Sequence, residues 1–213
     1  MGTLNRITAS GEGKVMHIQC DLDLSETRIG DSIAVNGACL TAVSLAKNGF
    51  SVDMAPETVA RTTFKDLTPG ARVNIERAMK LSARLDGHLV SGHIDGTGVI
   101  SGIQKKSNAV IITVEVAPDL AADMIEKGSV AIDGISLTIN RCSTSDFEVS
   151  IIPHTAEITT IGQKKTGDKV NIETDMIGKY VKKILMGNVS KNDASSAGGN
   201  GISMELLARN GFL

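Results

Sequence analysis

Hydrophobic and polar residues alternate with a period of two along much of this chain. Residues 32–35 and 129–132 alternate in this way and run into an Asn-Gly and an Asp-Gly pair, respectively. Such pairs are a strong signal for a tight hairpin turn. Residues 50–54 and 147–151 alternate as well, and each run ends before a proline, which cannot donate to a strand ladder. Short strands at this spacing predict a small closed barrel.

A helical period is found in three other places. Residues 121–127 are expected to form one or two turns between strands, and residues 202–213 a short docking segment. Residues 175–186 predict an amphipathic helix that packs on a barrel or pairs with another subunit. Its apolar stripe consists of Ile177, Tyr180, Val181, Ile184 and Leu185. Residues 187–213 begin with a run rich in Gly, Asn, Ser and Lys, and we expect a flexible tail there.

The chain contains an internal duplication. Residues 32–76 align with residues 129–173 without a gap, with 16 identities in 45 positions. The run Val-Asn-Ile-Glu recurs intact at the end of both copies. A repeat of this kind indicates one structural unit used twice. We therefore predict two homologous barrels in tandem, an N-terminal one at residues 1–87 and a C-terminal one at residues 88–174.

The two copies differ at their starts. Residues 88–95 precede a Gly-Thr pair and are expected to form a leading strand of the second copy, whereas only Met1 precedes the matching pair in the first. On this alignment the first barrel lacks a strand and has an open edge, which proteins usually avoid. His88 and His93, five positions apart on such a strand, would face opposite sides.

The amino-acid composition argues against several classes of function. The 213 residues carry a net charge of −2 with only 2% aromatic residues, which argues against nucleic acid as a partner. No apolar run is long enough for a membrane span, so we expect no membrane partner and a cytoplasmic location. Three widely spaced cysteines and four histidines without ligand spacing predict neither a disulfide framework nor a metal site. A small, neutral or weakly charged partner fits best.

The duplication highlights several candidate site positions. Cys39 follows the first Asn-Gly turn and aligns with Ser136. Taken alone, Cys39 is more simply explained as a small buried hydrophobic residue, but alternation between Cys and Ser suggests a position that lines a pocket. Residues 56–58 and 153–155 both place a threonine two positions after a proline, which suits the edge of a polar heterocycle. His93, between glycine-containing segments, is a candidate acid or base.

These motifs resemble the signatures of the riboflavin synthase alpha-chain family, in the family's order and spacing across residues 2–185. The segments that carry the resemblance are residues 36–41, 74–77, 87–95, 127–128, 133–138 and 170–173.

The resemblance implies an all-β fold of two tandem six-stranded Greek-key barrels followed by a C-terminal helix. It implies a homotrimer that dismutates two molecules of 6,7-dimethyl-8-ribityllumazine into riboflavin and 5-amino-6-(ribitylamino)uracil without a cofactor. Each active site would lie between the N-terminal barrel of one subunit and the C-terminal barrel of its neighbour. An association with lumazine synthase is a further expectation.

By position, the resemblance also implies which residues form the site. Those that would hold the first lumazine are Cys39, Leu40, Thr41, Asp53, Met54, Ala55, Pro56, Glu57 and Thr58, with Gly92, His93 and Ile94 closing the pocket. Those that would hold the second are Lys127, Ser136, Leu137, Thr138, Ile152, Pro153, His154, Thr155, Ala156 and Glu157. The residues expected to transfer protons or assist as nucleophiles are Ser32, Cys39 and His93.

The chain departs from the family at its start and leaves two alternatives open. The family normally opens with Met-Phe-Thr-Gly-Ile, whereas this sequence reads Met-Gly-Thr. We expect a misassigned start rather than a barrel that truly lacks its first strand. One alternative function is a non-catalytic lumazine- or flavin-binding relative on the same barrels. The other is an interaction protein in which the duplication serves assembly alone.

Overall fold

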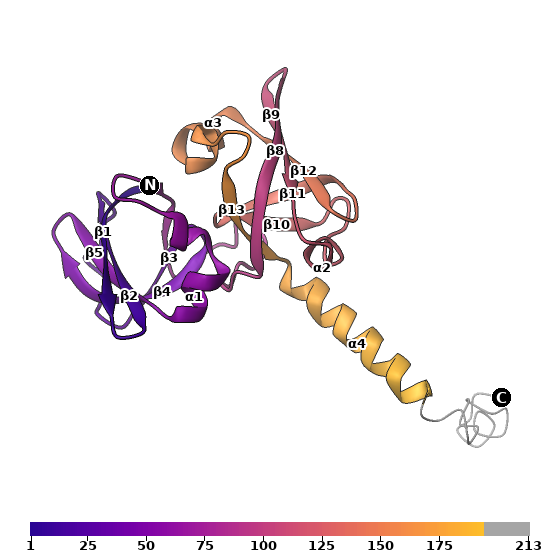
Figure 1. Cartoon of the computed structure of the whole chain (residues 1–213), viewed down its shortest axis with the longest axis horizontal. Helices are drawn as coiled ribbons and strands as arrows, with labels where there is room; N and C mark the ends of the chain where they lie inside the picture. The colour runs from indigo at the N-terminus through magenta and orange to yellow at the C-terminus, as the bar shows by residue number, and fades with distance from the viewer. Residues whose placement is uncertain (194–213) are drawn as a thin grey trace. The chain divides into compact units, whose positions relative to one another are not determined.

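The computed structural model describes residues 1–193 of the chain. Residues 1–176 form one compact unit that contains both barrels, and residues 177–193 belong to a second unit. Figure 1 shows the N-terminal barrel in indigo and purple and the C-terminal barrel in magenta and orange. The predicted all-β tandem architecture is confirmed.

The N-terminal barrel is an antiparallel sheet. Its strands are β1 (Gly2–Ser10), β2 (Gly13–Cys20), β3 (Ser32–Val35), β4 (Ala38–Ala46), β5 (Gly49–Met54), β6 (Arg72–Val73) and β7 (Ile75–Arg77). They pair in the order β6-β1-β2-β5-β4-β3-β7. The two end strands are consecutive pieces of one chain segment interrupted at Asn74. Six strand positions therefore surround this core, as in the second barrel.

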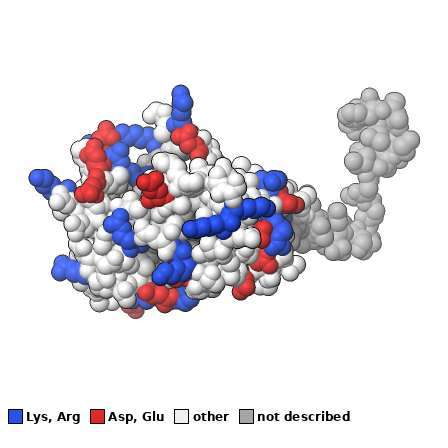
Figure 2. All heavy atoms as spheres, turned by 90° about the horizontal axis from the view of Figure 1, so that it is seen from above, with Lys and Arg blue, Asp and Glu red and all other residues white. Residues whose placement is uncertain are grey.

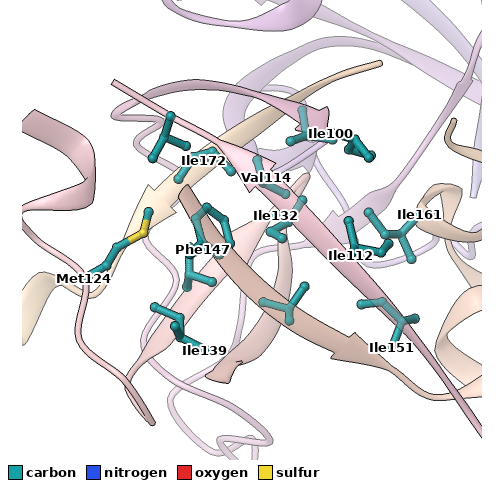
Figure 3. Close-up of a cluster of buried hydrophobic side chains, with 14 of the residues drawn as sticks. Ile100, Ile112, Val114, Met124, Ile132, Ile139, Phe147, Ile151, Ile161 and Ile172 are labelled. Carbon is teal, nitrogen blue, oxygen red and sulfur yellow. The ribbon is translucent and has the colours of Figure 1, made fainter. Parts of the chain in front are cut away.

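The C-terminal barrel is closed, in the order β10-β11-β12-β9-β8-β13. Its strands are β8 (Gly96–Lys106), β9 (Ala109–Glu115), β10 (Ser129–Ile132), β11 (Ile135–Cys142), β12 (Asp146–Ile151) and β13 (Lys169–Thr174). Phe147 lies fully buried in its interior among branched aliphatic side chains such as Val114 and Ile132 (Figure 3). Burial of these side chains is the main stabilising contribution to each barrel.

The predicted hairpin turns are confirmed in both copies. Asn36 and Gly37 have φ angles of 41° and 79°, and Asp133 and Gly134 have φ angles of 46° and 82°. Two successive positive φ angles are typical of a type I′ turn, which matches the twist of the strands on either side. Only short polar residues and glycine adopt this backbone easily, so the turn chemistry fixes the register of both hairpins.

The helices differ from the sequence expectation. The structure has α1 (Pro56–Arg61) and α3 (Pro153–Ile158) after β5 and β12, each followed by a 3₁₀ turn, η1 (Thr63–Asp66) and η2 (Thr160–Gln163). A proline at the first helical position begins both helices, which is a favoured location because its missing N–H is not needed there. The helical turn between β9 and β10, α2 (Pro118–Ala121), lies earlier than predicted.

The C-terminal helix, α4 (Met176–Asp193), is present. It continues seven residues past the predicted end at residue 186, so the first part of the predicted tail is helical. The rest of that tail, including the predicted docking segment, lies outside the described residues. Along the described part of the chain, no helix is both long and apolar enough to cross a membrane.

The expectation that the first barrel lacks a strand is wrong. Strand β1 spans Gly2–Ser10 and pairs with β2 along its whole length, while Gly2 and Thr3 pair with β6. The predicted leading strand at residues 88–95 does not form. Backbone N–H and C=O groups of that segment instead form hydrogen bonds with side chains and backbone groups of both barrels.

The two barrels contact each other through reciprocal asparagines. Asn171, fully buried on β13, accepts a hydrogen bond from Thr63 N–H at 2.8 Å through Oδ1 and donates through Nδ2 to Asn36 O at 2.9 Å. Both partners belong to the N-terminal barrel. Asn74 makes the equivalent pair in the other direction, with Thr160 N–H at 2.9 Å and Asp133 O at 3.0 Å. The same residue of the repeat therefore joins the barrels twice.

The hairpin turns meet at the centre of this contact. A Cβ atom built on Gly37 would lie 2.6 Å from Gly134 N, and one on Gly134 would lie 2.9 Å from Gly37 Cα. No side chain fits between two backbones this close. The interface departs from symmetry at Asp133, whose carboxylate is fully buried and pairs with Lys164 at 3.2 Å, where the first barrel has the neutral Asn36. Burial raises the pKa of Asp133, an effect that Lys164 opposes.

Candidate functional site

Several predicted residues of the first site lie on the outer face of the N-terminal barrel. On β4, Cys39 and Thr41 are exposed while Leu40 between them is buried. Thr41 stands opposite Ser32 on β3 and opposite Asp53 on β5. Alternate strand residues share a face, so these four polar side chains form one outward row. Leu40 points into the core, so at this face it could contact a ligand only through its backbone.

The C-terminal barrel repeats this row. Thr138 stands opposite Ser129, and Ser136 stands opposite Ala131, in the same register that places Cys39 opposite Ala34. Leu137 packs partly against the C-terminal core. The structure thus presents two similar outer faces, one with a thiol and one with a hydroxyl at the matched position.

The segments around α1 and α3 form a second pair of matched edges. Met54 is buried, whereas Ala55, Pro56 and Glu57 are exposed and Thr58 is half-buried. In the second barrel the exposed residues are Ile152, Pro153, His154 and Glu157, with Thr155 and Ala156 half-buried. The carbonyls of Thr58 and Thr155 each accept a hydrogen bond of 2.6 Å from a threonine hydroxyl four residues later. These equivalent contacts hold both edges in the same conformation.

Lys127 lies just before β10, where the backbone pairs with β11 next to Thr138. It is exposed, has a φ angle of 64°, and donates its backbone N–H to Ile139 O at 2.8 Å. The structure fixes the backbone of Lys127 but gives its ammonium group no ion pair among the described residues. Lys127 therefore stays a predicted site residue on position alone.

The linker between the barrels, residues 78–95 between β7 and β8, reaches both faces. Within it, the backbone N–H of His88 donates to Ser136 Oγ at 3.3 Å, and its Nδ1 shares a hydrogen bond of 2.8 Å with the same hydroxyl. Burial lowers the pKa of His88, although the carboxylates of Asp175 and Glu173 act in the opposite direction. A neutral imidazole can accept a hydrogen bond from the hydroxyl through Nδ1, so His88 can orient the Ser136 side chain.

Further along, the linker crosses to the N-terminal barrel. Gly92 O accepts the backbone N–H of Cys39 at 2.8 Å, and a Cβ on Gly92 would lie 2.5 Å from Cys39 Cβ. With a φ angle of 83°, only glycine suits this position. Ile94 packs against the N-terminal core and His93 is exposed between them. His88 therefore contacts the C-terminal barrel, whereas the residues on either side of His93 contact the N-terminal barrel.

Two residues of this region, His88 and Glu173, were not predicted from the sequence. His88 stood out only through its spacing from His93, and Glu173 only as part of the repeated Val-Asn-Ile-Glu run. Glu173 is buried and receives hydrogen bonds from Ser91 and Gly92. Its equivalent Glu76 is exposed, so the repeat gave no signal that one copy of this glutamate holds the linker.

Other features of the surface lie apart from these faces. A shallow hollow of about 560 Å³ is lined by residues 21–25 and 45–48 of the N-terminal barrel, none of them a predicted site residue. Figure 2 shows Lys and Arg interspersed with Asp and Glu over the visible face. Within residues 1–193 no group of His, Cys, Asp or Glu side chains is arranged to hold a metal ion. Cys20, Cys39 and Cys142 are free thiols.

The known proteins to which this chain is similar all point to one family. Residues 1–78 and 91–175 each match the model of the lumazine binding domain. A riboflavin synthase of Bacillus subtilis is 43% identical over 212 residues, which cover 99% of this chain and 96% of that protein. A riboflavin synthase of Actinobacillus pleuropneumoniae is 42% identical over 212 residues, covering 100% of this chain and 96% of that protein.

Solved structures share the fold. The crystal structure of LumP complexed with 6,7-dimethyl-8-(1'-D-ribityl) lumazine matches with a TM-score of 0.73 at 22% identity, covering 81% of this chain and 94% of that chain. The crystal structure of LumP complexed with riboflavin matches with a TM-score of 0.75 at 23% identity and the same coverage. At this identity the likeness establishes the tandem-barrel architecture alone.

Proposed function

Because this chain belongs to the riboflavin synthase family and carries its lumazine binding domain twice, we propose that it is the transferase that forms riboflavin. Two molecules of 6,7-dimethyl-8-ribityllumazine react, and one gives a four-carbon unit to the other. The products are riboflavin and 5-amino-6-(ribitylamino)uracil. The two products together contain all the atoms of the two substrates, so the reaction needs no external oxidant, reductant or group donor.

The observation that carries this proposal is the duplicated outer face. Cys39 and Thr41 on one barrel and Ser136 and Thr138 on the other occupy the same positions of the same register. A dismutation needs two identical substrates held as donor and acceptor. Two similar faces that differ at matched polar positions such as Cys39 and Ser136 meet this need, since like substrates can be bound alike and then treated differently. Holding both reactants in place also removes the cost of a bimolecular encounter.

The proton transfers are assigned to the N-terminal face. The methyl group of the lumazine is intrinsically acidic, so a modest base in the right position suffices to remove its proton. Ser32, Cys39 and His93 supply hydroxyl, thiol and imidazole groups there: the first two share an outer face, and His93 follows Gly92, which is hydrogen-bonded to Cys39. We assign proton transfer to this trio, and substrate binding to the two matched rows and the edges formed by residues 53–58 and 152–157.

The active site is proposed to form between subunits of a homotrimer, with the N-terminal barrel of one copy facing the C-terminal barrel of a neighbour. The helix α4 supports this assembly. Its apolar stripe is exposed, with Tyr180 at 61%, Ile184 at 62% and Leu185 at 62% of their full accessibility. Side chains spaced by three and four residues along a helix form a continuous seam for another helix. A second copy of α4 is the occupant that we propose.

The cellular context follows from the same family. Three free cysteines are usual for proteins of reducing compartments, and we propose a cytoplasmic location. The lumazine substrate must come from an enzyme that builds it, and an association with lumazine synthase stays a prediction.

Turnover of the full chain tests this function. The purified protein is mixed with 6,7-dimethyl-8-ribityllumazine, and riboflavin is followed by its absorbance. We expect steady riboflavin formation that falls about 10-fold or more in Cys39→Ala and in Ser136→Ala, as is typical when a positioned polar group is removed. Ser44→Ala changes an exposed residue on the same strand as Cys39 and should retain full activity. Binding of the lumazine without riboflavin formation would instead establish a non-catalytic binding protein.

A further inference from the structure

Glu173 is a buried carboxylate whose two oxygens both bind the linker. Its Oε1 accepts hydrogen bonds from the backbone N–H and the hydroxyl of Ser91, both at 2.6 Å. Its Oε2 accepts the backbone N–H of Gly92 at 2.9 Å. Glu173 is only 2% exposed. Three linker donors therefore converge on one carboxylate from the last strand of the C-terminal barrel.

These hydrogen bonds are what makes the burial of Glu173 tolerable. Burying a carboxylate is costly unless it is paired or fully hydrogen-bonded. No lysine or arginine within the described residues forms an ion pair with Glu173. Charge-assisted hydrogen bonds are also shorter and stronger than neutral ones. The conformation of residues 91–92 and the burial of Glu173 consequently depend on each other.

Gly92 carries this constraint across to the other barrel. Its N–H is bound to Glu173 of the C-terminal barrel, while its carbonyl accepts the N–H of Cys39 in the N-terminal barrel at 2.8 Å. A single residue thus connects the carboxylate with the strand that presents Cys39. His93 is the next residue along the chain, so the same connection holds its backbone close to that of Cys39.

The matching glutamate shows that the barrel framework does not need this contact. Glu76 occupies the same position of the repeat and pairs with Ala34 as Glu173 pairs with Ala131. Its side chain is nevertheless exposed. The strand pairing at this position therefore forms with an exposed glutamate as well. The buried arrangement at Glu173 must serve the linker rather than the barrel.

We propose that Glu173 is a positioning residue that holds residues 91–93 so that the Gly92 carbonyl and His93 lie against Cys39. The proposal rests on the proposed function, because it concerns the placement of groups that transfer protons there. It also makes a separate structural claim, that the protection of the Ser91 and Gly92 amides depends on this carboxylate.

The test uses Glu173→Gln in the full chain. The substituted amide keeps one acceptor but presents an NH₂ donor to one of the linker N–H groups. We expect kcat to fall about 10- to 100-fold with the KM for lumazine changed less than about threefold, since misplacing a reacting group costs turnover more than binding. We also expect faster hydrogen exchange at Ser91 and Gly92. Glu12→Gln, in the exposed turn between β1 and β2, controls for kcat, and Glu76→Gln controls for the exchange.

A second variant keeps the test decisive if Glu173→Gln is poorly folded. Ser91→Ala removes one of the three hydrogen bonds and leaves the carboxylate in place, so kcat and amide protection should fall together by a smaller factor. Wild-type kcat in Glu173→Gln, or a loss confined to KM, would overturn the positioning role. If the wild-type chain forms no riboflavin, the proposed function fails, while amide exchange still decides whether Glu173 holds the linker.

Discussion

Substitution of Gly37 by alanine tests whether the barrels are held together by their hairpin turns. Gly37 has a φ angle of 79°, and its Cβ would stand 2.6 Å from Gly134 N and 2.9 Å from Gly134 Cα. Both neighbours are backbone atoms, so no flexible side chain can move aside. Gly70 is the matched control, because its φ angle is 92° and nothing lies within 4 Å of its Cβ position.

The expected cost has three parts. Placing alanine in the left-handed region costs about 1–2 kcal/mol, and this applies equally to Gly70→Ala. Forcing the two turns apart by roughly 1 Å is an overpacking effect of about 1–3 kcal/mol. The separation also strains the two hydrogen bonds of 2.9 and 3.0 Å that Asn171 and Asn74 donate to the turn carbonyls, each of which contributes about 1 kcal/mol. Gly37→Ala should thus destabilise the protein by about 2 kcal/mol or more beyond Gly70→Ala.

Urea unfolding followed by circular dichroism measures this difference. We expect a lower midpoint for Gly37→Ala than for Gly70→Ala, and a transition that begins to separate into two steps as the barrels unfold independently. Equal midpoints for the two variants would refute the reasoning, because they would mean that the close approach of Gly37 and Gly134 carries no energetic weight.

Three further outcomes are expected. Asn171→Ala leaves the buried Thr63 N–H and Asn36 carbonyl without partners and should lower the free energy of unfolding by about 2–5 kcal/mol, whereas a loss under about 1 kcal/mol would contradict the role of the asparagine in the interface. Burial raises the pKa of Asp133 above its ordinary value of 3.8, so at pH values between this and the raised pKa the folded state binds a proton that the unfolded state has released. The stability of the wild type relative to Asp133→Asn should therefore decrease as pH rises from about 4 to 7. A relative increase measured by thermal unfolding over that range would contradict this expectation. Ile184→Asp, on the exposed stripe of α4, should reduce the mass measured by light scattering from that of a trimer to that of a monomer, and an unchanged mass would exclude α4 as the contact.

The repeat predicted most of the architecture. Because residues 32–76 and 129–173 align without a gap, every strand, helix and turn of one copy has an equivalent in the other, from β3 and β10 to the final broken or continuous strand. The turn residues Asn36-Gly37 and Asp133-Gly134 also predicted their own backbone correctly. Local sequence sufficed here since hairpin type depends on the turn residues themselves.

The errors occurred where local pattern and tertiary contacts compete. Residues 56–61 and 153–158 begin with proline, which ended the preceding strands as predicted but also began helices that the alternation did not suggest. Residues 88–95 look like a strand, yet Ser91 and Gly92 donate to Glu173 and Gly92 accepts from Cys39. No periodicity can show that a segment binds two different barrels.

The candidate site shows the same division. The repeat placed Cys39 and Ser136 at equivalent positions, and the structure brings the predicted Ser32, Thr41 and Asp53 into the row beside Cys39. The assignment of their roles stays a prediction. The buried position of Glu173 could not be predicted from the sequence, because the identical Val-Asn-Ile-Glu runs contain one exposed and one buried glutamate. The difference arises from the linker that covers only the second copy.

The ratio of products formed by the full chain tests the central claim most directly. With purified protein and 6,7-dimethyl-8-ribityllumazine alone, lumazine consumed, riboflavin formed and 5-amino-6-(ribitylamino)uracil formed are quantified by chromatography over the same time course. A dismutation between two matched pockets predicts one molecule of each product for every two lumazines consumed, with no added cofactor. Riboflavin without an equal amount of the pyrimidine, or lumazine that is bound and recovered unchanged, would contradict it.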